Sequence, residues 1–132
     1  MVDDSQHRPT SIVLADDDDR FRTLVASILT EDGYSVIAEA NNASSARAAA
    51  KEHRPDVVIL DLVMEGSEGL STLREILEED PQQRVLVISS LFDLAIEQEA
   101  VALGGWYLEK AEGVDALEQA IDRIAEGPVN LR

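Results

Sequence analysis

The sequence predicts an α/β fold in which five parallel strands lie between two layers of helices. Two observations support this prediction. Short and nearly continuous apolar runs, typical of parallel strands buried on both faces, occur at 12–15, 34–40, 56–60, 84–89 and 106–110. Each run is followed by a stretch with helical features, so a strand–helix unit occurs five times. Right-handed crossovers between such units give a doubly wound parallel sheet.

The helix after the first run is predicted from its periodicity. Apolar residues follow the spacing of one helix face at Phe21, Leu24, Val25, Ile28 and Leu29. Asp18 or Asp19 can cap its start, and Gly33 can end it.

The other four helices are bounded by proline and glycine. The second, 43–53, is rich in strong helix formers and ends before Arg54 and Pro55. The third begins at about Gly69 and stops before Pro81. The last two are expected at about 93–103 and 114–126, each followed by glycine.

Composition excludes several classes of function. The chain has 132 residues, the size of one domain, and a net charge of −16, so direct contact with nucleic acid is not expected. The absence of cysteine excludes disulfides and thiol chemistry. The first ten residues are polar, and no apolar run is long enough to cross a membrane. We therefore expect a cytoplasmic protein without membrane contact.

Polar side chains follow four of the five predicted strands. Asp16 and Asp17 follow the first, Asp61 the third, Ser89 the fourth and Lys110 the fifth. Ligands of open α/β sheets bind outside the carboxyl ends of the strands, so these side chains are expected at one site.

The predicted cluster of carboxylates favours a divalent cation. Two unit charges about 4 Å apart repel by roughly 4 kcal/mol at an effective dielectric constant near 20. A shared cation relieves this repulsion, and oxygen ligands suit Mg²⁺. Asp61 comes from a different strand, and a carboxylate can attack a phosphoryl group to become an aspartyl phosphate.

These residues, in this order, resemble the receiver domain of bacterial two-component response regulators. The resemblance covers residues 10–127 and is carried by the segments IVLADDDDRFRTLV, RPDVVILDLVMEGSEGLSTLREI, RVLVISS and YLEK. It implies a flavodoxin-like, or CheY-like, three-layer fold with strand order 2-1-3-4-5. The NarL group, in which a LuxR-type DNA-binding domain follows the receiver, is the most similar.

The resemblance assigns the metal site and the phosphoacceptor. Asp61 aligns with the phosphoacceptor. Asp16 and Asp17 align with the acidic pair that holds Mg²⁺, and Val63 aligns with the position whose backbone carbonyl completes the metal shell.

The resemblance also assigns the residues that respond to phosphorylation. Ser89 aligns with the hydroxyl that follows the phosphoryl group, and Lys110 aligns with the lysine that pairs with a phosphoryl oxygen. Tyr107 resembles the aromatic switch residue of the fifth strand. Apolar Val63 and Leu91 flank the site and cannot orient an attacking water, so self-catalysed dephosphorylation is expected to be slow.

The implied role is signalling, not that of an enzyme. A sensor histidine kinase would donate the phosphoryl group, and the surface of helix 4, strand 5 and helix 5 would then change, with possible homodimerisation. The target protein stays open. Residues 10–127 form the expected receiver domain, with flexible tails at 1–9 and 128–132 and no output domain. The chain would be the regulatory part of a transcriptional regulator.

Other functions remain open from the residues alone. A receiver-like module that binds partners without phosphorylation is the main alternative. A haloacid-dehalogenase-type phosphatase also places aspartates two residues apart after its first strand, as Asp16 and Asp18 are, but Arg20 does not fit its pattern. A flavin carrier with this fold would have its phosphate repelled by the four aspartates at 16–19.

Overall fold

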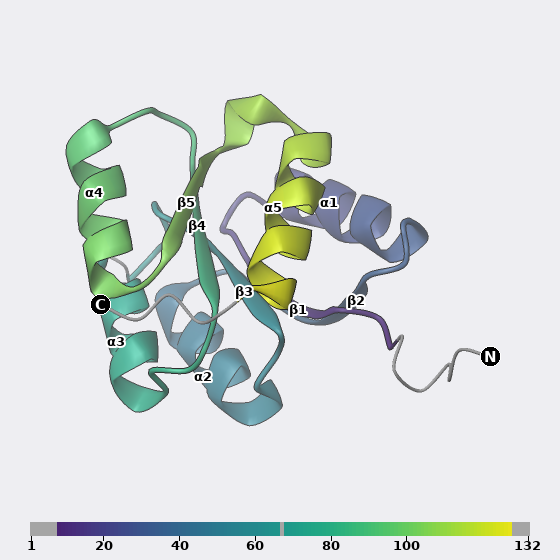
Figure 1. The fold of residues 1–132 in the computed structure, drawn as a ribbon, viewed down its shortest axis with the longest axis horizontal. Coiled ribbons are helices and arrows are strands. Elements are labelled where there is room, and N and C mark those ends of the chain that lie inside the picture. Colours follow the sequence, from purple (N-terminus) through teal and green to yellow (C-terminus); the bar gives the residue numbers. More distant parts are fainter. Residues whose placement is uncertain (1–7, 67, 128–132) are drawn as a thin grey trace.

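A computed structural model shows a five-stranded parallel sheet covered by helices on both faces, and it describes residues 8–66 and 68–127 (Figure 1). The strand order is β2-β1-β3-β4-β5, as the resemblance implies. The strands are β1 (Ser11–Ala15), β2 (Ser35–Ala40), β3 (Val57–Asp61), β4 (Val85–Ser89) and β5 (Trp106–Glu109). The helices are α1 (Asp19–Glu31), α2 (Ala43–His53), α3 (Ser71–Glu79), α4 (Leu94–Leu103) and α5 (Val114–Glu126), with a 3₁₀ turn η2 (Lys110–Glu112) before α5.

The two faces of the sheet form two separate apolar cores. In β1, Ile12 and Leu14 belong to the core beneath α1 and α5, whereas Val13 and Ala15 belong to the core beneath α2, α3 and α4. Figure 1 shows α1 and α5 on one side of the sheet. β1, β3 and β4 are buried on both faces, which explains their nearly continuous apolar runs.

The caps of α1 and α2 fix where these helices begin and end. The side chain of Asp18 accepts hydrogen bonds from the backbone N–H groups of Arg20 and Phe21, so Asp18 is the cap of α1. Asn42 caps α2 in the same way. Arg54 follows α2 in the left-handed conformation, with φ of 44°, immediately before Pro55. The predicted range 43–53 matches α2.

Several predicted boundaries differ from the structure by one or two residues, and two of these differences have a clear local cause. α3 begins at Ser71 and not at Gly69, because Gly69 has a φ of 56°, which is incompatible with a right-handed helix. β5 ends at Glu109, so Lys110 is the first residue of η2 and not the last residue of a strand. None of the helices in the described ranges is long and apolar enough to cross a membrane.

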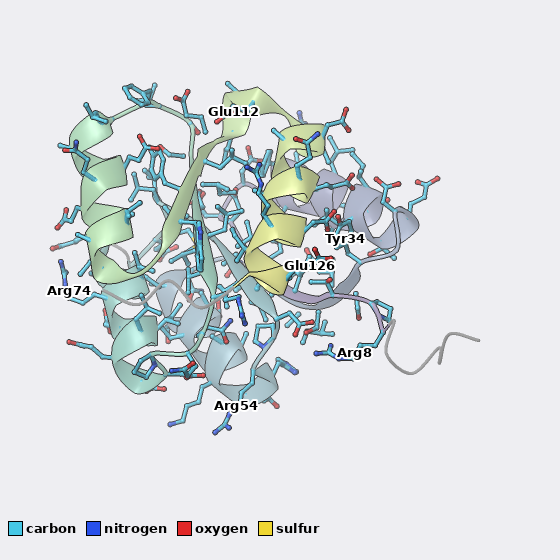
Figure 2. All side chains as sticks on the ribbon, viewed as in Figure 1. Arg8, Tyr34, Arg54, Arg74, Glu112 and Glu126 are labelled. Atoms are coloured by element: carbon cyan, nitrogen blue, oxygen red, sulfur yellow. The ribbon has the colours of Figure 1, made fainter. Side chains whose placement is uncertain are left out.

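The expected tails lie mostly outside the described residues, which exclude 1–7 and 128–132. Arg8, inside the expected N-terminal tail, donates two hydrogen bonds to the carboxylate of Asp56, at 2.9 and 3.0 Å. Figure 2 shows Arg8 and Arg54 far from Glu112 of η2, which lies at the carboxyl edge of the sheet. The site described below lies at that carboxyl edge.

Candidate metal-binding site

Three aspartates gather where β1 and β3 end. One carboxylate oxygen from each of Asp16, Asp17 and Asp61 lies within 4.8 Å of the others. β1 and β3 are adjacent parallel strands with Ala15 opposite Leu60, so Asp16, which follows β1, and Asp61, the last residue of β3, lie side by side. Asp16 and Asp61 are buried, whereas Asp17 is exposed, so the cluster is open to solvent on one side. This arrangement can hold a metal ion.

The conformation of Asp16 is fixed by its neighbours. Its Oδ1 accepts a hydrogen bond from the backbone N–H of Asp18 at 2.9 Å. Its backbone N–H donates to the carbonyl of Ala40 in β2, and its carbonyl accepts from Arg22 Nη1 at 2.6 Å. Its Oδ2 is buried and has no hydrogen-bond partner in the described part of the chain.

Lys110 places one positive charge against the acids. Its Nζ lies 2.7 Å from Asp16 Oδ2 and 3.6 Å from Asp61 Oδ2. The shorter contact is an ion pair between the ammonium and the buried Asp16 Oδ2. The ammonium also lies 4.3 Å from the centroid of the Phe21 ring, a cation–π contact from α1.

The charge balance of the cluster is incomplete. Burial and the neighbouring Asp16 raise the pKa of Asp61 to about 6, although Lys110 and the N–H of Val63 act in the opposite direction. The Val63 N–H donates to Asp61 Oδ1 at 3.4 Å, which is a long contact. A divalent cation bound among the three carboxylates would remove this repulsion.

Ser89 and Tyr107 contact a loop rather than the acids. Ser89 is buried at the end of β4, next to β3. Its hydroxyl donates to the carbonyl of Leu91 at 2.8 Å, and Tyr107 donates to the same carbonyl at 3.1 Å. In the residues that the structure describes, neither hydroxyl is hydrogen-bonded to Asp61. Leu91 therefore joins the two side chains that the sequence identified as switch residues.

Sequence reasoning missed two contacts that α1 makes with the site. Phe21 was identified only as part of an apolar helix face, and Arg22 was not singled out. The signal that could have found them is position, because both lie in the first turn of a helix that starts three residues after Asp16.

A parallel sheet in the order 2-1-3-4-5 with an acidic cluster at its carboxyl edge fits the CheY-like receiver class of two-component signalling proteins. The family model of the response regulator receiver domain matches residues 12–122, and the chain belongs to this family.

Known proteins of this class are similar over most of the chain. The chemotaxis protein CheY of Bacillus subtilis is 31% identical over 113 residues, which cover 85% of this chain and 94% of CheY. The signal receiver domain of the response regulator NarL from Mycobacterium tuberculosis superposes with a TM-score of 0.83 at 28% identity, covering 91% of this chain and 98% of that one. A LuxR-family response regulator from Aurantimonas gives 0.82 at 31% identity, covering 92% and 88%.

Proposed function

We propose that Asp61 accepts a phosphoryl group from a phosphohistidine of a sensor histidine kinase. An oxygen of the Asp61 carboxylate would form the new P–O bond while the P–N bond to the histidine breaks, and the imidazole would leave with the electron pair. The observation that carries this proposal is the buried position of Asp61 between the other acids and Lys110, whose Nζ is 3.6 Å away.

Mg²⁺ is the proposed metal, held by the side chains of Asp16, Asp17 and Asp61 and by the backbone carbonyl of Val63. The donor set supports this choice, because it consists of oxygen atoms, and one carboxylate oxygen from each of the three aspartates lies within 4.8 Å of the others. Once bound, the ion would offset the negative charge that an incoming phosphoryl group brings to the cluster. Lys110 would pair with a phosphoryl oxygen.

The proposed switch uses the shared carbonyl of Leu91. A phosphoryl group on Asp61 adds acceptor oxygens next to β4, so the Ser89 hydroxyl would turn toward them and leave Leu91. The loop after β4 would then lose one of the two hydroxyl donors that hold it, and Tyr107 would move with it. The surface formed by α4, β5 and α5 would change its population of conformations.

The proposed phosphoacceptor role also implies the bounds of the domain, its location in the cell and its regulatory role. The receiver domain would span 10–127 and act in the cytoplasm, without direct contact with nucleic acid and with slow self-catalysed dephosphorylation. Similarity to the NarL and LuxR-family proteins supports a role as the regulatory part of a transcriptional regulator, with homodimerisation after phosphorylation.

The test uses acetyl phosphate as a small phosphoryl donor. The chain is incubated with acetyl phosphate and MgCl₂, and the modified species is measured by phosphate-affinity electrophoresis and mass spectrometry. We expect a modified species that Asp61→Asn abolishes and that Asp115→Asn, a change at an exposed aspartate of α5, retains.

A second measurement detects the switch. Beryllofluoride with MgCl₂ mimics the phosphoryl group and should change the fluorescence of Trp106, the single tryptophan, which lies on β5 next to Tyr107. Absence of both modification and fluorescence change would overturn the proposal and favour a receiver-like module that binds its partner without phosphorylation.

A further inference from the structure

We propose that Arg22 is a positioning residue of the metal site, because it holds the peptide unit that joins Asp16 to Asp17. The inference rests on the proposed function, since it concerns Mg²⁺ binding by the same cluster.

The side chain of Arg22 joins three elements of the fold. It is only 14% exposed, although it lies on α1 near the surface. Nη1 donates to the backbone carbonyl of Asp16 at 2.6 Å, and Nε donates to Glu39 Oε1 at 3.0 Å. Nη2 lies 2.8 Å from Asp19 Oδ1. The guanidinium thus connects the end of β1, the end of β2 and the first turn of α1.

The contact with the Asp16 carbonyl controls where Asp17 points. A peptide unit is planar, so a fixed carbonyl oxygen also fixes the direction in which the chain enters the next residue. The side chain of Asp17 is exposed and makes neither a hydrogen bond nor an ion pair with any described residue. Its place in the cluster therefore depends on its backbone. Arg22 holds this backbone at the Asp16 carbonyl, and the hydrogen bond from the Asp18 N–H to Asp16 Oδ1 holds it on the other side of Asp17.

Arg22 does not occupy the metal site itself. It reaches the carbonyl oxygen of Asp16 and the carboxylates of Asp19 and Glu39, and it leaves the carboxylates of the cluster to Lys110 and to solvent. Two effects of removing Arg22 therefore have opposite signs. Loss of a nearby positive charge would tighten the binding of a cation, whereas loss of the fixed peptide unit would weaken it.

The experiment measures Mg²⁺ affinity on the folded protein. MgCl₂ is titrated into ¹⁵N-labelled protein, and the dissociation constant is obtained from the amide shifts of Asp17 and Asp18. The same spectra report whether each variant is folded. We compare wild type with Arg22→Met, which removes both the charge and the contacts, and with Arg22→Lys, which keeps the charge but cannot reach three acceptors at once.

The control is Arg20→Met. Arg20 is exposed in the same turn of α1, and its side chain has no partner in the part of the chain that the structure describes. This variant removes the same charge without touching the Asp16 carbonyl. Any effect of charge alone therefore appears in the control as well.

We expect the Mg²⁺ dissociation constant to be about tenfold higher in both Arg22 variants, as for other residues that orient metal ligands. In Arg20→Met, the Mg²⁺ dissociation constant should be unchanged or slightly lower than in wild type. An unchanged or lower dissociation constant in folded Arg22→Lys, which keeps the charge, would overturn the inference. A dissociation constant for folded Arg22→Met that is no higher than that of Arg20→Met would also overturn it. A wild-type protein that does not bind Mg²⁺ would overturn the proposed metal site and this inference together. Wild-type binding that all variants retain would overturn only the role of Arg22.

Discussion

Replacing Asp61 by asparagine should make the metal-free protein more stable, although it removes the proposed phosphoacceptor. Asp61 is buried beside Asp16, and one ammonium, that of Lys110, contacts both carboxylates. Asparagine has nearly the same shape and carries no charge. The substitution therefore removes a buried negative charge without opening a cavity.

The size of the effect follows from the pKa of Asp61. Burial and Asp16 raise it from 3.8 to about 6. Each pKa unit corresponds to about 1.4 kcal/mol, so keeping Asp61 ionised at pH 7.5 costs the folded state about 3 kcal/mol. Below about pH 4, Asp61 is protonated in both the folded and the unfolded state, so its burial costs no stability. As the pH rises above the unfolded pKa of 3.8, the unfolded state is favoured increasingly, until the pH passes the folded pKa of about 6. The advantage of Asp61→Asn should therefore be greatest above pH 6 and disappear toward pH 4.

The assay is urea unfolding in the presence of EDTA, followed by circular dichroism, at several pH values between 4 and 8. We expect Asp61→Asn to raise the free energy of unfolding at pH 7.5 by about 2 to 3 kcal/mol. Addition of MgCl₂ should stabilise wild type more than the variant and narrow the difference. A variant that is no more stable than wild type at pH 7.5 would refute the reasoning, because it would mean that Lys110 already neutralises the cluster.

Three further predictions concern other parts of the molecule. Lys110→Met should lower the free energy of unfolding by about 3 kcal/mol at pH 7.5, because buried Asp16 loses its charge partner. Urea unfolding without metal measures this change, and an unchanged free energy of unfolding would contradict the prediction. Burial, together with Asp32 and other acids, raises the pKa of Glu118 to about 7, so its ionisation destabilises the fold as the pH rises from 4.5 through 7. Glu118→Gln should therefore gain about 1 kcal/mol over wild type at pH 8 and nothing at pH 4, as measured by urea unfolding. The phosphorylated protein should lose its phosphoryl group slowly, since Val63 and Leu91 are apolar and exposed beside the site; a half-life of seconds in a phosphate-release assay would contradict this.

The overall fold could be predicted because its signals are local. Apolar runs mark strands buried on both faces, and the alternation with helices leaves few possible topologies. Helix limits were accurate where a side chain caps the end, as Asn42 does for α2. The start of α3 was not at Gly69, because the sequence does not show that this glycine takes a positive φ. The end of the fifth strand was not at Lys110, because a short 3₁₀ turn replaces the last predicted strand residue.

The site could be predicted in part because parallel strands end at one edge. That rule placed Asp16, Asp61 and Lys110 together. The structure brings the Lys110 ammonium to 2.7 Å from Asp16 and 3.6 Å from Asp61, and carboxylate oxygens of the two aspartates lie within 4.8 Å of each other. It could not place the hydroxyl of Ser89, whose partner depends on the path of the loop after β4. It also could not find Arg22, since its critical partner is a backbone carbonyl, which has no signature in the sequence.

The site has two parts, the acidic cluster and the loop after β4, and different elements of the fold contact each part. α1 fixes the acids through Asp18 and Arg22, whereas the loop after β4 holds Tyr107 through the carbonyl of Leu91. Sites without shared partners respond independently to mutation. Tyr107→Phe should therefore leave the Mg²⁺ dissociation constant unchanged while it alters the fluorescence response to beryllofluoride. If the same substitution weakened Mg²⁺ binding as much as Arg22→Met, the loop and the acids would form one coupled unit, and the switch would have to act through the metal ligands and not through Leu91.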